Sequence, residues 1–338
     1  MNSHSQIFRY SAPVFLCILL QSFSLLNNKY LISNDPKIEG GIWNDPSLDP
    51  QCSPISSFSC PAVVKNLPFA LNFTGSEGGL QDKSGVPAGF FMVDKPSAPL
   101  VIPTYVNTPG YEPSKLQITT GKLIITTTAG ISYLNPAQSA GTNSQVNALG
   151  VGFVAPSKFN IQTTLAQPNA GTGKSEQAGL WFGLDEDNYV KLVVLSTGSG
   201  NSKVEMRKEI AAISTTADVK NTASMTLSSS LVKLKFVVNK VTNTIEGFYG
   251  INGATEVSIG SLTIPQSFTT GKTLSDGVTQ NITFAGIFAT HRNAATALNF
   301  SFEDFKVELT STNPSVVSVN PQTMQQMLVR MHLYLLTF

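Results

Sequence analysis

The sequence predicts an all-β protein, an antiparallel jelly-roll β-sandwich of two packed sheets. Short runs in which apolar and polar residues alternate recur along residues 65–310, and Gly, Asn and Pro separate them. Several runs are rich in β-branched residues, as in Leu123–Thr128, which suits half-buried strands. No long amphipathic helical pattern interrupts residues 65–310, so we expect strands to form the core.

About a dozen strands are expected, a number that suits two sheets with aligned cores. In chain order they lie near Phe69–Phe73, Leu116–Thr128, Ala148–Val154, Phe159–Leu165, Gly179–Leu184, Tyr189–Leu195, Lys203–Glu209, Val232–Val238, Thr244–Tyr249, Ser258–Ile264, Ile282–Ala289 and Phe300–Leu309. The strand at 232–238 has the clearest inward-facing row, made of Val232, Leu234, Phe236 and Val238.

Residues 178–194 contain the clearest hairpin, two alternating strands joined by the acidic turn Asp185–Asn188. One face of this hairpin is apolar and is expected to point to the core: Leu180, Phe182, Leu184, Val190, Leu192 and Val194. The other face mixes rings, a glycine and polar groups: Trp181, Gly183, Tyr189, Lys191 and Val193. This second face is interpreted as a ligand surface open to solvent.

Several segments follow the order and spacing of a known fold: YEPSKLQITTGKLIITTTAG (111–130), NALGVGF (147–153), AGLWFGLDEDNYVKLVV (178–194), AGIFATHRN (285–293) and FSFEDFKVEL (300–309). Together they resemble the concanavalin A-like lectin/glucanase superfamily. The nearest likenesses are the laminin G-like sandwiches and the accessory sandwich domains attached to β-xylosidases. The resemblance covers residues 65–310 and implies a carbohydrate or glycoprotein as partner.

A sugar-binding site on the hairpin face is the favoured hypothesis. Trp181 and Tyr189 would stack on sugar rings, and the polar contacts would come from Lys191, Arg207, Asn188, Asn293 and His291. The alternative for Trp181 is a place in the core. On the favoured hypothesis the module binds carbohydrate and does not catalyse. The alternatives are a structural or adhesion spacer of a multi-domain surface protein and a glycoside hydrolase acting on β-glucan or xylan.

Catalysis is the weaker hypothesis because no Glu-x-Asp-x-x-Glu run, the carboxylate array of glycosidases in this superfamily, occurs in the chain. Glu205 and Glu209 flank Arg207 on one strand face, where the guanidinium would keep both acids ionised. No catalytic residue is therefore predicted. The sequence leaves enzymatic activity undecided and favours its absence.

No cofactor is predicted, although calcium is a candidate through Asp185 and Asp187. Turn formation by these two acids is the favoured alternative. The formal net charge of +1 argues against a nucleic-acid partner, which would need clustered basic residues. The pair Lys233 and Lys235 is interpreted as a solvated strand face.

The amino terminus predicts export. Residues 1–26 contain Arg9 followed by a short apolar run, the pattern of a signal peptide. If it is not cleaved, this segment would be a signal anchor, and we expect contact with a membrane only through it. Residues 27–64 form an extended leader in which Cys52 and Cys60 are expected to make a disulfide. The sequons at Asn72, Asn281 and Asn299 are expected glycosylation sites. We therefore expect a secreted or surface-displayed protein.

The tail after the sandwich changes character. Within residues 311–338, NPSVVSVNP (313–321) resembles the opening strand of bacterial immunoglobulin-like domains. The residues that follow are not those expected of such a domain. If residues 322–336 are back-translated with permitted codons, a shifted reading frame encodes residues that such a domain would contain. The tail is therefore interpreted as a linker and a truncated or frameshifted module, with a short apolar C-terminal helix as the alternative.

Overall fold

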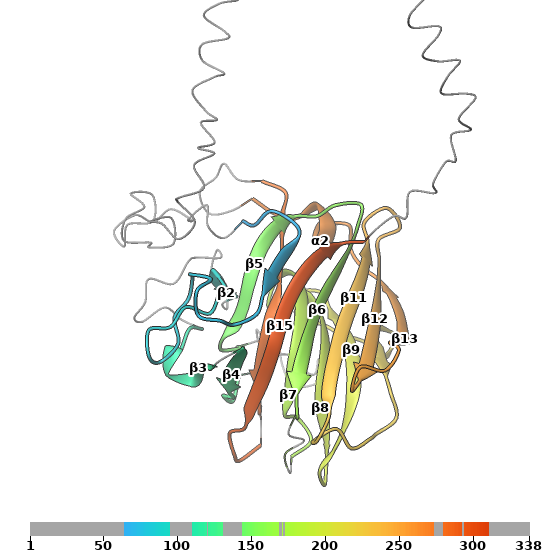
Figure 1. Ribbon diagram of the computed structural model, residues 1–338. Coiled ribbons are helices and arrows are strands. Elements are labelled where there is room, and N and C mark those ends of the chain that lie inside the picture. The colour runs from blue at the N-terminus through green and yellow to red at the C-terminus, as the bar shows by residue number, and fades with distance from the viewer. Residues whose placement is uncertain are drawn as a thin grey trace, which may run out of the picture. The chain divides into compact units, whose positions relative to one another are not determined.

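Two antiparallel sheets pack face to face (Figure 1). The structure, a computed structural model, describes residues 64–94, 110–119, 121–130, 144–168, 171, 173–273, 280–292 and 294–310. The predictions on the signal segment, the Cys52 and Cys60 loop, Asn293 and the tail from residue 311 onward lie outside these ranges. Among the described residues, no helix has the length and apolar content needed to cross a membrane.

One sheet has eight strands. Seven of them follow each other in the order β13 (Val257–Thr263), β12 (Thr244–Ile251), β11 (Leu231–Asn239), β6 (Lys158–Ala166), β15 (Asn299–Leu309), β4 (Lys122–Thr126) and β3 (Leu116–Thr119). The eighth, β1 (Phe69–Leu71), pairs with β15. Figure 1 shows β15 beside β6, with β11, β12 and β13 following on one side.

The other sheet has seven strands, in the order β10 (Val219–Asn221), β9 (Asn201–Glu209), β8 (Asn188–Gly198), β7 (Gln177–Asp185), β14 (Ile282–Thr290), β5 (Ala148–Val154) and β2 (Met92–Asp94). Short helices are the 3-10 turns η2 (Pro113–Lys115) and η4 (Thr216–Asp218) and the single α-helical turn α2 (Ser267–Thr270). Each sheet thus joins strands that are far apart in the sequence, because β14 and β15 both lie inside their sheets.

The main core lies between the sheets, and its residues are those that alternation predicts. Val232, Leu234, Phe236 and Val238 are fully buried in it. The inward face of the β7–β8 hairpin contributes Leu180, Phe182, Val190, Leu192 and Val194. The ring of Phe159 bridges those of Phe153 and Phe182, with centroids 5.3 and 5.7 Å away in edge-to-face geometry. The predicted fold class, a jelly-roll sandwich of two antiparallel sheets, is confirmed.

The strand prediction differs from the structure in two respects. The single strand expected at 116–128 is a hairpin, β3 and β4, that reverses at Gly121, whose φ of +73° suits glycine. The three-residue strands β2 and β10 were not predicted, because three residues are too short for alternation to show.

Candidate functional site

The predicted ligand surface is the outer face of the seven-stranded sheet, and the structure buries it. A second apolar cluster occupies this face, made of Met92, Ala148, Trp181, Tyr189, Val193, Ile282, Phe284 and Phe288. Trp181 is 3% exposed, Tyr189 4% and Lys191 1%. The sequence assigned these side chains to the correct face. The prediction that they are open to solvent is wrong.

Glycines on neighbouring strands explain why Trp181 is buried. Trp181 on β7 is in register with Gly286 of β14, which is in register with Gly150 of β5. Neither glycine has a side chain, so the indole reaches across to β5, where a Cβ on Gly150 would lie 2.6 Å from Trp181 Cζ2. The indole N–H donates to the carbonyl of Leu149 at 3.1 Å. The ring is a packing element with no open face for sugar stacking, so that predicted role is wrong.

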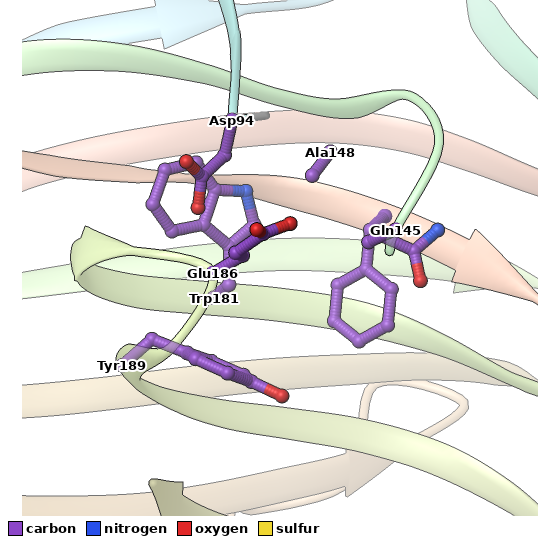
Figure 2. A pocket seen from close by; sticks show the side chains of 7 residues that line it. Asp94, Gln145, Ala148, Trp181, Glu186 and Tyr189 are labelled. Carbon is purple, nitrogen blue, oxygen red and sulfur yellow. The ribbon is translucent and has the colours of Figure 1, made fainter. Parts of the chain in front are cut away.

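A small pocket remains beside this ring (Figure 2). Its lining combines aromatic, acidic and amide side chains: Asp94, Gln145, Ala148, Trp181, Glu186, Tyr189 and Phe288. The space among them is about 20 Å³, which suits one water-sized molecule. The Gln145 amide nitrogen donates to the carbonyls of Val146 and Ala289 at 2.8 and 3.1 Å. The pocket has residue types that suit a sugar, but it has no room for one.

The charged residues next to the pocket form hydrogen bonds and ion pairs within the protein. Lys191 Nζ donates to Gln177 Oε1 at 2.9 Å. Glu205 accepts from Arg207 Nε at 2.9 Å and pairs with Lys203 Nζ at 3.0 Å. Burial lowers the pKa of Lys191 to about 8, against the opposing effect of Glu205 and Glu209. Lys191 and Arg207, predicted to contact sugar hydroxyls, are therefore engaged within the protein.

The acids that flank Arg207 are poorly placed for glycoside hydrolysis. Burial raises the pKa of Glu205, but Lys191, Arg207 and Lys203 together outweigh it, and the pKa lies below its usual value. The predicted ion pair of Arg207 with Glu205 is confirmed. Glu209 accepts a hydrogen bond from the Tyr189 hydroxyl at 2.8 Å. Burial, with Glu209 beside it, raises the pKa of Tyr189 well above its ordinary value. A carboxylate held ionised like Glu205 cannot serve as the general acid.

The remaining predicted contacts belong to turns. Asn188 Nδ2 donates to Asp185 Oδ1 at 2.7 Å, and Asn188 Oδ1 accepts from the backbone N–H of Ala211 at 3.0 Å. Asp185 Oδ1 also accepts from the N–H of Asp187 at 3.2 Å, as expected of an acidic turn. His291 Nδ1 is 2.9 Å from Thr127 Oγ1, at the end of β14, and does not line the pocket. Both polar groups of the Asn188 side chain are thus used within the protein.

Two further predictions can be compared with the described residues. In this part of the chain, no group of three or more His, Cys, Asp or Glu side chains is placed to hold a metal ion. The three sequon asparagines, Asn72, Asn281 and Asn299, are all exposed.

A wider depression lies on the outer face of the eight-stranded sheet, which no site prediction covered. It is an open hollow of about 530 Å³, lined by Lys233, Phe248, Gly250, Gly253, Ala254, Thr255 and Glu256. Phe248 on β12 is half-buried and is in register with Lys235 of β11, whose Nζ lies 5.0 Å from the ring centroid. Phe248 belongs to neither apolar cluster. A part-exposed ring in a row of polar residues is the signal that sequence reasoning missed.

The two charged groups that line this depression, Lys233 and Glu256, form a short chain of ion pairs with the neighbouring Lys235. Glu256 Oε1 lies 2.9 Å from Lys233 Nζ, and Glu256 Oε2 accepts from Lys235 Nζ. The two lysines are on β11, and Glu256 is on the loop that follows β12. Lys233 and Lys235, interpreted from the sequence as a solvated strand face, are in addition paired with Glu256.

The backbone fixes the loop between β12 and β13. Asn252 and Gly253 have φ of +53° and +78°, the left-handed pair of a tight turn. The N–H of Ala254 donates to the carbonyl of Ile251 at 3.0 Å. Asn252 also exchanges hydrogen bonds with the backbone of Leu231, each at 2.8 Å. The wall of the depression that carries Glu256 is thus tied to the sheet.

Comparison with known proteins gives likenesses of fold. No protein-family profile matches the chain, and no curated protein matches it. Among solved structures it is similar to the GH43 BlXynB protein from Bacillus licheniformis, with 17% identity, a TM-score of 0.40, and coverage of 57% of this chain and 34% of that one. The chain thus spans about a third of that protein's length.

It is also similar to the endo-1,3-beta-glucanase from Streptomyces sioyaensis, with 11% identity, a TM-score of 0.40, and coverage of 71% and 94% of the two chains. The Lotus tetragonolobus seed lectin gives 11% identity, a TM-score of 0.35, and coverage of 58% and 90%. The observed fold, two packed antiparallel sheets, is the one that the sequence resemblance implied.

Proposed function

We propose that this protein is a non-catalytic carbohydrate-binding module whose ligand lies in the depression around Phe248. The observation that carries the proposal is the half-buried Phe248 ring in an open space of about 530 Å³, bordered by Lys233 and Glu256. Small-molecule sites combine an apolar or aromatic surface with a few placed polar groups and have volumes of about 300–1,000 Å³. The depression has this composition and size.

The chemistry suits a sugar ring. The apolar face of a pyranose can lie against the Phe248 ring, while its hydroxyl groups exchange hydrogen bonds with the Lys233 ammonium and the Glu256 carboxylate. Because Asn252 and Gly253 fix the loop, little ordering would be needed on binding. The same observations favour binding over hydrolysis, since Glu256 is the one carboxylate among the residues that line the depression and it is paired with two lysines.

An extracellular location is consistent with the proposed carbohydrate binding. The side chains of Asn72, Asn281 and Asn299 are exposed, as N-glycosylation requires. We propose a secreted or surface-displayed location, supported by these exposed side chains and by the predicted amino-terminal signal.

A glycan array followed by calorimetric titration of the full chain tests the proposal. Phe248→Ala should abolish binding and leave the circular dichroism spectrum unchanged, because the ring lies outside both apolar clusters. Val241→Ala is the matched control: Val241 is 77% exposed at the other end of the β11–β12 hairpin, and its loss should not affect binding.

Three results would contradict the proposal. If the wild-type protein binds no glycan, the spacer hypothesis stands in its place. If Phe248→Ala binds as well as the wild type, the ligand lies elsewhere. Cleavage of β-glucan or xylan that is lost in Glu205→Gln or Glu209→Gln would show a hydrolase.

A further inference from the structure

The lysine pair of the Phe248 depression already holds a carboxylate. Lys233 and Lys235 are two residues apart on β11, so their side chains point to the same face. Both ammonium groups contact the Glu256 carboxylate, one at each oxygen. Each ammonium has three N–H donors, and the contact with Glu256 uses one of them. The pair is therefore spaced to straddle a carboxylate and retains donors for a second one.

The two ammonium groups outnumber the carboxylate that they share. Lys233 and Glu256 line the depression, and Lys235 lies beside it, paired with Glu256 and 5.0 Å from the centroid of the Phe248 ring. These three groups carry a net charge of +1 (2 − 1) where they meet. Glu246 and Glu308 lie outside the lining and accept hydrogen bonds from Ser258 Oγ at 2.6 Å and Gln162 Nε2 at 3.1 Å, and their charges act on Lys235 from that side.

The lowered pKa of Lys235 also favours an anion near the two lysines. Burial lowers the pKa of this lysine first, and the neighbouring Lys233 lowers it further, whereas Glu246 and Glu308 raise it. The side chain of Lys233 is 41% exposed, so its ammonium is accessible from solvent. An anionic group bound near both ammonium groups would relieve their mutual repulsion.

We infer that the depression selects acidic sugars, with the carboxylate of a hexuronate bound by Lys233 and Lys235 and the sugar ring lying against Phe248. The inference rests on the proposed function and names the class of ligand. Glu256 then has two effects: it aligns the lysines, and its negative charge competes with that of the ligand. Neutralising Glu256 should therefore tighten binding, which is the opposite of what a purely supporting acid would show.

Matched ligands separate charge from shape. The full-length protein is titrated with oligogalacturonate and oligomannuronate, each beside its methyl ester, which keeps the ring and removes the charge. We expect at least one acid to bind about tenfold more tightly than its ester, the ratio expected for one charge-assisted hydrogen bond. Raising the salt concentration from about 0.05 to 0.5 M should weaken binding of the acid and leave that of the ester unchanged.

Matched variants locate the charge. Lys233→Met should lower the affinity for the acid about tenfold and leave the affinity for the ester unchanged. Glu256→Gln should raise the affinity for the acid several-fold. Lys306→Met is the control, since Lys306 lies in the same row of the sheet as Lys235, two strands away, and pairs with Asp304. Its affinity for the acid should equal that of the wild type.

The possible failures are distinguishable. If acid and ester bind equally, or if Lys233→Met and Lys306→Met lose the same affinity, the acidic-sugar inference is wrong and the proposed function survives. A decrease on Glu256→Gln also contradicts the inference, because the negative charge of Glu256 would then favour ligand binding and not compete with the charge of the ligand. If neither uronates nor any neutral glycan bind, the proposed function itself fails.

Discussion

Replacing Trp181 with alanine tests whether the outer face of the seven-stranded sheet is a second core. The side chain is 3% exposed, and it lies over Gly150, which has no side chain to fill the space it would leave. Truncating a buried tryptophan costs about 3–5 kcal/mol. The hydrogen bond to the Leu149 carbonyl adds about 0.5–1.5 kcal/mol. We therefore expect a loss of about 5 kcal/mol, a large part of the roughly 5–15 kcal/mol that stabilises a typical domain.

The measurement is unfolding in guanidinium chloride followed by far-UV circular dichroism, which comes mainly from the backbone and can follow unfolding after the indole is removed. Phe248→Ala is the comparison variant. Its ring is half-buried and outside both clusters, so its stability should stay within about 1 kcal/mol of the wild type. The reasoning is refuted if Trp181→Ala also unfolds within about 1 kcal/mol of the wild type. A folded Trp181→Ala protein that has lost glycan binding would restore the role predicted from sequence.

Two further predictions concern the same face. Gly150→Ala places a Cβ 2.6 Å from Trp181 Cζ2 and should destabilise the fold by about 1–3 kcal/mol; in a Trp181→Ala background the same change should cost much less, and additive losses would contradict the contact. Lys191, with a folded-state pKa of about 8 and an ordinary value of 10.5, binds fewer protons when folded than when unfolded between these two pH values. Raising the pH from 8 to 10 should therefore stabilise the wild type relative to Lys191→Met, by up to about 3 kcal/mol, and equal pH profiles in chemical denaturation would show that folding does not lower the pKa of Lys191.

Alternation along single strands predicted most of the fold. The inward rows of β7, β8 and β11 are those expected, because each was set by residues only two positions apart in the sequence. Burial of the opposite face could not be predicted in the same way. It depends on Gly150 and Gly286, which lie on strands about 30 and 105 residues from Trp181, and sequence alone does not show which strands are neighbours.

The Phe248 depression was not predicted, although one part of it follows from the expected strands. The expected strand at 244–249 already placed Phe248 on the same face as Glu246, two positions earlier. What the sequence did not show is that β11 brings Lys235 into register with Phe248, or that the loop returns Glu256 to both lysines. The site depends on the pairing of β11 with β12 and on the turn after β12, and contacts far apart in the sequence determine both.

The position of β14 and β15 has a consequence for how the protein is made. β14 lies between β7 and β5, and β15 lies between β6 and β4, yet these are the last two strands of the described chain. In a nascent chain that ends before Ile282, the seven-stranded sheet is therefore in two unconnected pieces, and the eight-stranded sheet is in two pieces with β1 left without its partner strand. Most of β14 is apolar, and all nine of its residues are buried in the finished fold. The seven-stranded sheet can close only once β14 has been made, when this strand enters the gap between β7 and β5, which lie more than 95 residues earlier in the chain.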